Sequence, residues 1–220
     1  MKKIIIIAQA RLTSKRFPGK VLMKIKNKTL IEILYLRLKN SKLINKFIFA
    51  IPKNFKNLEL KKFLLKKKLY FIEGPEKNVL KRFFIAAFKS EADIIVRLTC
   101  DCPLIDKIIL KKMIRKFLSL KDIDYMSNTT IVKNKFPDGM DIEIFTYSSL
   151  KETYAKAKKI YDKEHVTSYI RKNFKTYGFE SNIDYSNKKW SVDTFEDLNT
   201  IKKIFSKFKY NFKVKYNNII

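Results

Sequence analysis

Short apolar runs alternate with longer segments of helical periodicity along the first half of the chain. Residues 3–8 form a continuous β-branched run, which predicts a buried strand. Residues 29–39 carry apolar side chains three and four positions apart, which predicts an amphipathic helix. The same alternation predicts strands at 47–51, 69–72 and 93–98 and helices at 58–67, 76–89 and 106–117. It indicates an α/β fold, a mostly parallel sheet with helices on both faces.

After residue 122 the rhythm changes and the connections lengthen. We expect strands at 125–128, 141–145 and 176–179, helices at 148–159, 163–172 and 195–207, and an edge strand at 211–216. Without repeats or a flexible linker, residues 1–220 are expected to form one domain whose second half covers a site. In such sheets ligands bind outside the carboxyl ends of the strands, so we expect the residues of a binding site in the loops that follow strands.

The formal charge of +28 suggests a polyanionic partner, but composition weakens that inference. Of the 49 basic residues 42 are Lys, and the five residue types with A/T-rich codons make up 115 of 220 positions, so codon bias explains most of the charge. The chain has no run of the ~18 apolar residues that a membrane helix needs and no signal-peptide pattern. Its two cysteines cannot form a disulfide framework. We therefore expect a cytoplasmic protein without membrane insertion.

The loop 9–20, QARLTSKRFPGK, follows the first predicted strand and is rich in cations. Arg11 and Arg16 offer planar forks for phosphate and Lys20 offers a compact charge, while Gly19 permits a tight turn. The alternative is a solvated basic loop. We interpret the whole constellation as a phosphate site, and it is not the GxxxxGK[ST] loop of ordinary ATPases.

Two carboxylates stand at the ends of predicted strands in the loops RLTCDCPL and WSVDTFEDL. Asp101 is suited to a divalent ion that bridges nucleotide phosphates, since Asp106 is the better helix cap. Capping explains Thr194 and Asp197 but not Asp193, which becomes a candidate for the second metal carboxylate.

A third acidic pair lies in FPDGMDIEIF, where Asp141 and Glu143 have the same parity and point to one face of a predicted strand. They line a substrate pocket or belong to a solvated edge strand, and we favour the pocket. The single histidine, His165, lacks the partners of a hydrolytic triad, so a structural role or contact with substrate is expected.

In their order, these motifs resemble those of the cytidylyltransferase-like spore coat polysaccharide biosynthesis family, a relative of the 3-deoxy-manno-octulosonate and acylneuraminate cytidylyltransferases. The likeness extends from about residue 2 to 205 and also includes EGPEKNVLKRFFIAA and EHVTSYIR. It implies a Rossmann-like nucleotide-diphospho-sugar transferase sandwich with a mixed, mostly parallel sheet. It further implies that CTP and a small acidic sugar or phosphorylated acceptor give a CMP-linked product and pyrophosphate, with Mg²⁺ or Mn²⁺ as cofactor.

By position, the resemblance makes Arg11, Lys20 and Asp101 catalytic, and Asp101 and Asp193 the metal ligands. Residues 1–120 would be the nucleotide-binding half and 121–220 the acceptor-binding half; a homodimer is left open. The implied nucleotide-binding residues are Ala8, Gln9, Arg11, Ser14, Arg16, Lys20, Gly74 and Arg82. The implied acceptor-binding residues are Asp138, Asp141, Glu143 and His165.

The chain departs from the family pattern at Thr13, Cys100 and Phe195, and in the base-proximal loop at Lys77, Asn78 and Lys81. The changes in the base-proximal loop leave the identity of the nucleotide open. Two alternatives therefore stand beside the enzyme: a catalytically silent binding subunit, and a basic nucleic-acid-binding protein. The latter requires that the aromatics of 210–216, interleaved with Lys, share one exposed face.

Overall fold

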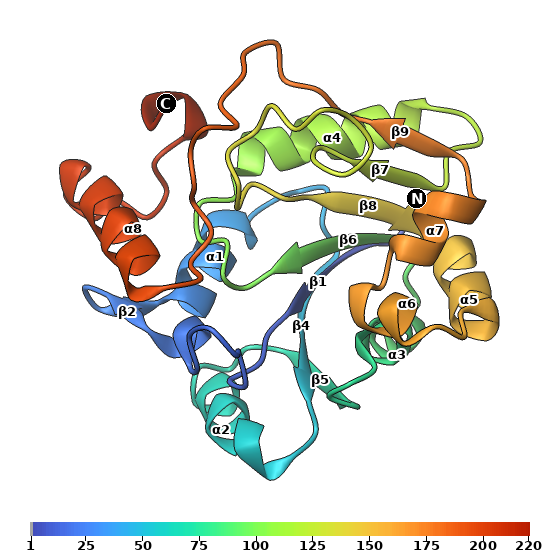
Figure 1. Cartoon of the computed structure of the whole chain (residues 1–220), viewed down its shortest axis with the longest axis horizontal. Helices are drawn as coiled ribbons and strands as arrows, with labels where there is room; N and C mark the ends of the chain where they lie inside the picture. Colours follow the sequence, from blue (N-terminus) through green and yellow to red (C-terminus); the bar gives the residue numbers. More distant parts are fainter. Residues whose placement is uncertain (1) are drawn as a thin grey trace.

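The computed structural model describes residues 2–220, and within them a seven-stranded mixed sheet forms the centre of the molecule (Figure 1). β1 pairs in parallel with β4 and β6, and β4 with β5, whereas β8 runs antiparallel to both β6 and β7. β9 pairs in parallel with β7. The spatial order is β5 (Phe71–Gly74), β4 (Lys46–Pro52), β1 (Ile4–Gln9), β6 (Ile94–Thr99), β8 (Glu143–Thr146), β7 (Tyr125–Ser127) and β9 (Thr176–Gly178). The predicted α/β fold with a mixed, mostly parallel sheet is confirmed.

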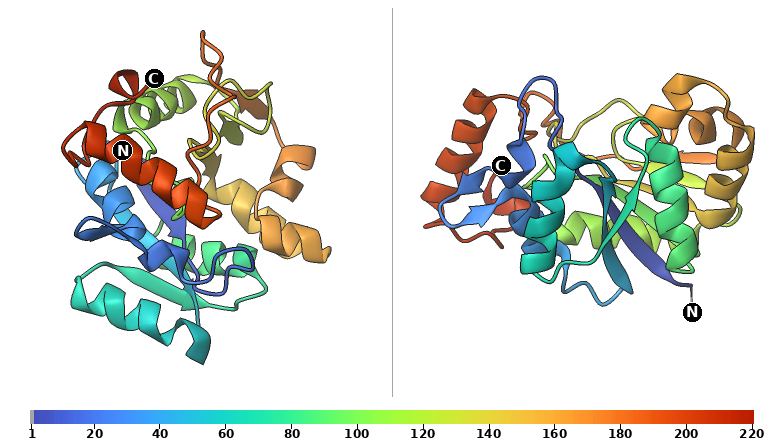
Figure 2. Two further views of the ribbon diagram at one scale, coloured as in Figure 1. Left: turned by 60° about the vertical axis from the view of Figure 1, so that its left-hand side comes forward. Right: turned by 90° about the horizontal axis from the view of Figure 1, so that it is seen from below.

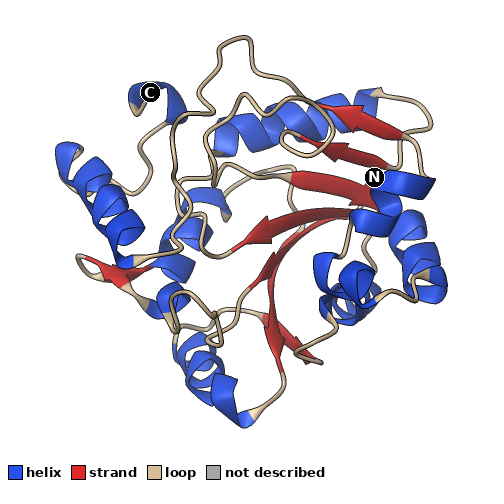
Figure 3. Cartoon of the chain, in the orientation of Figure 1, coloured by secondary structure: helices blue, strands red, loops and turns tan. Residues whose placement is uncertain are grey.

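Helices cover both faces of this sheet because its central strands are apolar on both sides (Figures 2 and 3). In β1, Ile4 and Ile6 belong to one core cluster, and Ile5 and Ile7 to the other. The first cluster is completed by α1 (Leu30–Leu38), α2 (Leu58–Lys66), α4 (Lys107–Ser119) and α8 (Phe195–Lys207). The second is completed by α3 (Val79–Lys89), α5 (Tyr147–Lys156) and the segment containing α6 (Ile160–His165) and α7 (Ser168–Asn173). Among the described helices none has the length and apolarity to cross a bilayer.

Side-chain caps set where several helices begin. Thr194 and Asp197 form the predicted capping box of α8, and Asp106 accepts hydrogen bonds from Ile108 N at 2.7 Å and Ile109 N at 3.2 Å at the start of α4. α3 begins at Val79 rather than at 76, because Asn78 accepts a bond from Lys81 N and caps the helix there. Residues 75–78 are thereby left as a loop beside the sheet edge.

The single helix predicted over 163–172 is wrong, because the chain turns sharply at Val166. This residue has φ 57° and ψ −56°, and Thr167 N donates to the carbonyl of His165 at 2.5 Å. A positive φ at a β-branched residue is strained and costs about 1–3 kcal/mol. Complete burial of Val166 and a hydrogen bond from Thr167 Oγ1 to Glu143 hold the turn and separate α6 from α7.

The predicted edge strand at 211–216 is also wrong. This segment forms turns that lead into a short 3₁₀ helix, Tyr216–Asn218, with Val214 and Tyr216 in the core. The buried guanidinium of Arg37 donates to the carbonyls of Phe212 and Val214 and so replaces the ladder of a strand. Because Tyr216 is buried, the aromatics of this stretch do not share the exposed face that a nucleic-acid-binding surface requires.

Three smaller differences concern the segments around the site. A two-stranded hairpin, β2 (Lys24–Ile25) and β3 (Lys28–Thr29), was not expected from the sequence. β8 begins at Glu143, so Asp141 precedes the strand, and β8 is an interior strand, which rules out the edge-strand alternative. The strand expected before Asp193 is replaced by irregular backbone that is anchored by a bridge between Asp138 and Lys189.

Candidate active site

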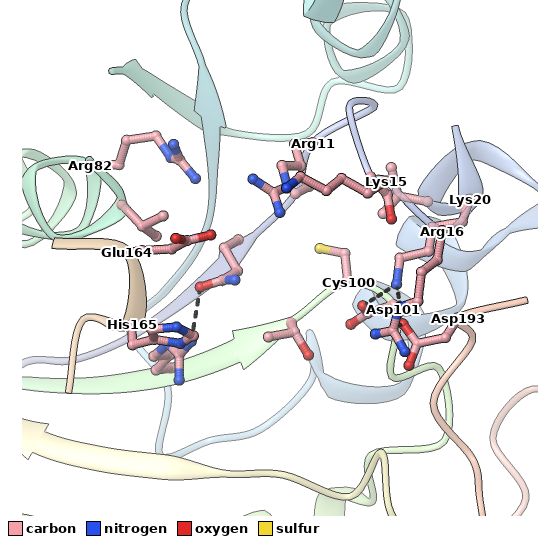
Figure 4. Close-up of a pocket in the computed structure, with 17 residues that line it drawn as sticks. Arg11, Lys15, Arg16, Lys20, Arg82, Cys100, Asp101, Glu164, His165 and Asp193 are labelled. Atoms are coloured by element: carbon pink, nitrogen blue, oxygen red, sulfur yellow. Dashed lines mark hydrogen bonds and ion pairs between the residues drawn. The ribbon is translucent and has the colours of Figure 1, made fainter. Parts of the chain in front are cut away.

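A pocket of about 440 Å³ opens at the carboxyl ends of β1 and β6 (Figure 4). Its walls come from the loops after these two strands, the first turn of α3, the last residues of α6 and the segment before α8. Most of the predicted site residues line it, namely Gln9, Arg11, Ser14, Arg16, Lys20, Arg82, Asp101, His165 and Asp193.

At one end of the pocket, the Lys20 ammonium lies between the two predicted metal carboxylates. Its Nζ is 2.5 Å from Asp101 Oδ2 and 2.9 Å from Asp193 Oδ1, and Arg16 Nη2 is also 2.9 Å from Asp193 Oδ1. Burial by itself disfavours the Lys20 charge, but the two carboxylates outweigh it and raise the pKa of Lys20. In turn, Lys20 overcomes the effect of burial on Asp101 and lowers the pKa of that carboxyl group.

Backbone bonds place both partners of this cluster. Gly19 adopts a left-handed conformation with φ 73°, and its N–H donates to the Leu12 carbonyl at 2.9 Å, which closes the loop directly before Lys20. On the other side, Val192 N donates to the Asp101 carbonyl at 2.9 Å. This bond ties the residue before Asp193 to the loop after β6, so the two carboxylates meet although they are far apart in the chain.

The opposite end of the pocket contains Arg82, Glu164 and His165, and Arg11 lies between the two ends (Figure 4). Arg82 Nη1 donates to the carbonyls of Pro75 at 2.6 Å and of Glu76 at 2.8 Å. Burial and the neighbouring charge of Arg11 lower the pKa of Arg82 to about 10. Two guanidinium groups thus approach each other at the pocket wall, an arrangement that an anion stabilises.

The loop before α3 is tied to the loop after β1 by a hydrogen-bond network. Glu76 accepts from the Thr13 hydroxyl and from Asn54 Nδ2 at 2.7 Å. Asn57, which donates to Asn54, accepts from Leu12 N at 2.8 Å. The loops after β1, β4 and β5 are therefore held together. Thr13, which stands where the resembled family usually has Gly, takes part through a hydroxyl group that glycine lacks.

Two of the predicted nucleotide residues do not line the pocket. Ala8 is fully buried within β1. Gly74 ends β5, and a side chain there would meet Arg82, because an added Cβ would lie 2.8 Å from Arg82 Cγ. Gly74 therefore makes room for a residue of the pocket wall rather than facing the pocket itself.

Three predicted acceptor residues lie outside this pocket. Asp138 is exposed and accepts from Ser191 Oγ at 2.7 Å, while Asp141 accepts from Gly139 N at 3.2 Å. Gly139 has φ 94°, and an added Cβ would lie 2.3 Å from Ser191 N, so only glycine allows this turn to approach the segment before Asp193. Contact of Asp138 and Asp141 with an acceptor stays a prediction.

Glu143 is buried instead of facing the pocket. Its carboxylate accepts from Arg97, from the Tyr125 hydroxyl at 2.5 Å and from Thr167 Oγ1 at 2.7 Å. Burial would raise the pKa of Glu143, but the ion pair with Arg97 and the hydroxyl donors lower it. The carboxylate is therefore surrounded by donors of the protein and does not line the pocket.

Besides Ala10, Lys15, Val21 and Val79, four residues that line the pocket were not singled out as site residues from the sequence: Arg97, Thr99, Cys100 and Glu164. Parity offered a signal for the first two, since Arg97, Thr99 and Asp101 are two positions apart at the end of one strand. Cys100 was expected to be a small core residue, and it is buried, but it also borders the pocket. Glu164 could have been found only through its neighbour His165.

The donor set at Asp101 and Asp193 suits a hard divalent cation. Both oxygens that contact Lys20 belong to carboxylates, and magnesium is usually held by one or two carboxylates together with phosphate oxygens. Within residues 2–220 there is no cluster of three or more His, Cys, Asp or Glu side chains that could hold a metal. A cation at this place would therefore take its remaining ligands from water or from a bound phosphate.

Comparison with known proteins identifies the family of the chain. A family model described as "Cytidylyltransferase" matches residues 5–219. A cytidylyltransferase structure from Leptospira borgpetersenii is 31% identical, with a TM-score of 0.93 over 100% of this chain and 92% of that one. The spore coat polysaccharide biosynthesis protein SpsF of Bacillus subtilis is 28% identical over 94% of this chain and 88% of its own length.

A more distant structure, CMP:2-keto-3-deoxy-manno-octonic acid synthetase in complex with CTP, shares the fold with a TM-score of 0.72 at 16% identity. It covers 94% of this chain and 100% of its own. The match of the family model over almost the whole sequence decides the assignment. This chain belongs to the cytidylyltransferase family and is a nucleotidyltransferase.

Proposed function

We propose that the enzyme transfers the cytidylyl group of CTP to a small acceptor and releases pyrophosphate, in the synthesis of surface-polysaccharide or glycan precursors. The acceptor would be an acidic sugar or a phosphorylated compound. The observation that carries the proposal is the cluster of Lys20, Asp101 and Asp193 at one end of a pocket that Arg11, Arg16 and Arg82 also line. The polysaccharide role rests on the likeness to SpsF, and CTP on the family and on the synthetase that binds it.

The reaction requires positioning and neutralisation of charge more than covalent catalysis. An acceptor oxygen attacks the α-phosphorus, a new P–O bond forms, and the bond to the bridging oxygen breaks so that pyrophosphate leaves with the electron pair. A hydroxyl acceptor loses its proton, whereas an ionised phosphate acceptor has none to lose. Arg11 and Lys20 would hold the negative charge that accumulates on the departing pyrophosphate, and Ser14 would donate a hydrogen bond to it.

Asp101 and Asp193 would hold the magnesium ion, or manganese in its place. When bound, such a cation neutralises phosphate charge and aligns the two reactants. For this to occur, the Lys20 ammonium must leave its position between the carboxylates. Lys20 ends the loop 9–20, so its side chain could turn toward the phosphates of a bound nucleotide while the backbone stays in place.

Gln9 and Arg82 would face the base and ribose, with the loop 75–78 holding Arg82 in place. The second half of the chain would supply the acceptor site, to which His165 would contribute from the pocket wall. The change at Lys77 and Asn78 from the family pattern makes the choice of nucleotide the first point to test. CTP, UTP, ATP and GTP are therefore compared, each with magnesium and with a panel of acidic sugars and sugar phosphates, by the release of pyrophosphate. Calorimetric titration of the four nucleotides accompanies this assay. Preference for CTP supports the proposal, and absence of binding by every triphosphate overturns it.

A further inference from the structure

Glu143 connects two walls of the pocket without lining it. One of its oxygens accepts from Arg97 Nη1, and the other accepts from Thr167 Oγ1 at 2.7 Å and from Tyr125 OH at 2.5 Å. The side chain is 6% exposed, and every polar partner that it has is a buried or half-buried protein group. A buried carboxylate with this many donors is fixed in orientation, and it fixes its donors in return.

Through Arg97, Glu143 determines how Gln9 is presented. Arg97 Nη2 donates to Gln9 Oε1 at 3.2 Å, so the amide oxygen is occupied and the NH₂ group is the end left for the pocket. A ligand group opposite Gln9 must then accept a hydrogen bond, as a carbonyl, hydroxyl or phosphate oxygen does. Without the guanidinium the amide could rotate and present either end.

Through Thr167, Glu143 also holds the strained turn at Val166. Thr167 directly follows this turn, and its N–H closes it onto the His165 carbonyl at 2.5 Å. Glu164 and His165 precede the turn and line the pocket (Figure 4). A strained backbone persists only where its surroundings over-determine it, and the bond from Thr167 to Glu143 is one of the contacts that do so here.

We propose that Glu143 is a positioning residue for the transfer reaction, which aligns the Gln9 amide and the Glu164–His165 wall by means of Arg97 and Thr167. It contacts neither substrate. The kinetic part of this inference rests on the proposed function, whereas the structural part does not. Glu143 therefore has a different role from the direct contact with acceptor that the sequence suggested.

The test uses the variant Thr167→Val, which keeps the shape of the side chain and removes the hydroxyl group that donates to Glu143 at 2.7 Å and lies 3.4 Å from the His165 carbonyl. Thr153→Val is the matched control, because Thr153 is equally buried and its hydroxyl has no partner within the described residues. The protein contains a single histidine, so the imidazole signals in an NMR spectrum report on His165 alone.

We expect Thr167→Val to shift or broaden the His165 signals and to raise an apparent KM roughly 3- to 10-fold while kcat changes less, as the loss of one hydrogen bond predicts. Thr167→Ser should restore both, and Thr153→Val should change neither. Unchanged His165 signals in a folded Thr167→Val protein overturn the proposal, even if no substrate has been identified. Glu143→Gln is measured beside it, because it leaves the Thr167 hydroxyl and its contact with the His165 carbonyl in place. It should change the His165 signals as well, and unchanged signals in this variant overturn the proposal, whether or not Thr167→Val folds.

Discussion

The backbone N–H of Val192 donates to the carbonyl oxygen of Asp101 at 2.9 Å, and this bond brings Asp193 beside Asp101. The pair of carboxylates is thereby fixed by main-chain geometry, independently of the side chains that carry the charge. Lys20 occupies the space between them and neutralises a site that would otherwise hold two like charges. Substitutions of these side chains should consequently change chemistry more than folding.

Asp101→Asn and Asp193→Asn should each lower the rate of pyrophosphate release by roughly 100-fold or more. Asn is similar in shape and can still accept from Lys20, so the thermal unfolding midpoint should change little. The rate is measured with saturating nucleotide, and Mn²⁺ binding is followed by calorimetry with nucleotide present. Asp184→Asn, on an exposed turn, is the control. Full turnover by Asp101→Asn would remove this residue from the metal site.

Lys20→Met should raise the KM for the triphosphate roughly 10- to 100-fold. The reason is that Lys20 is buried beside Asp101 and Asp193 at one end of the pocket. Most other lysines are exposed to solvent, where salt screens their charge. Lys151→Met, on the exposed side of α5, removes the same charge from the surface and should leave KM unchanged. Equal effects of the two substitutions would mean that the diffuse positive charge attracts the nucleotide, and that the motif does not.

Asp141→Asn should stabilise the protein at neutral pH. Burial, with the neighbouring charge of Asp138, raises the pKa of Asp141 above its ordinary 3.8. The folded state therefore holds this proton more tightly than the unfolded state, and stability is lost as pH rises from the ordinary value through the raised one. Urea unfolding at pH 7 should show a higher midpoint for the variant, and the difference should vanish near pH 3.

Asp141→Asn also tests whether Asp141 contacts the acceptor. A rise in KM for the acceptor together with the gain in stability would support contact with substrate, because functional carboxylates are often held at a cost in stability. Asp122→Asn, on an exposed turn, is the control for the loss of one negative charge. If the variant is less stable than the wild type at pH 7, the hydrogen bond from Gly139 outweighs the cost of burial.

Arg37→Met should lower the free energy of unfolding by about 3–5 kcal/mol. The guanidinium donates to four carbonyls, those of Leu104, Ile105, Phe212 and Val214, and Met satisfies none of them. Urea denaturation measures the loss, and limited proteolysis should cut first in residues 208–220. Arg115→Met is the control for the removal of an exposed arginine. Stability equal to that of the wild type would show that the tail packs without Arg37.

The sequence was sufficient where a local signal and the tertiary environment agree. The apolar run 3–8 is buried on both faces as β1, and Thr194 and Asp197 cap α8 as their spacing indicates. The cationic loop 9–20 and the carboxylates Asp101 and Asp193 were also singled out from the sequence and do lie together in one pocket, because each follows a strand or precedes a capped helix. Their binding of phosphate and of a metal stays a prediction. In such places one short stretch of chain contains all of the information.

Prediction failed where a distant residue decides the conformation. Arg37 supplies the donors that keep 211–216 from becoming a strand. The burial of Val166 and the hydrogen bond from Thr167 to Glu143 interrupt a stretch with helical periodicity. Parity placed Glu143 on the same face as Asp141, but it could not reveal that Arg97, opposite Glu143 in the neighbouring strand, would turn this carboxylate into a buried ion pair. These contacts depend on the register between strands, which a single sequence does not specify.

The bond between Val192 and Asp101 also has a consequence for the order in which activity can arise during translation. Chains are made from the amino end at ~5–20 residues per second, and the first strands can pair as they emerge from the ribosome. The second carboxylate of the cluster lies at residue 193, so the pocket lacks one of its two carboxylates until this residue has been synthesised. A ribosome-bound chain therefore exposes the cationic loop 9–20 for several seconds before the cluster of Lys20, Asp101 and Asp193 is complete.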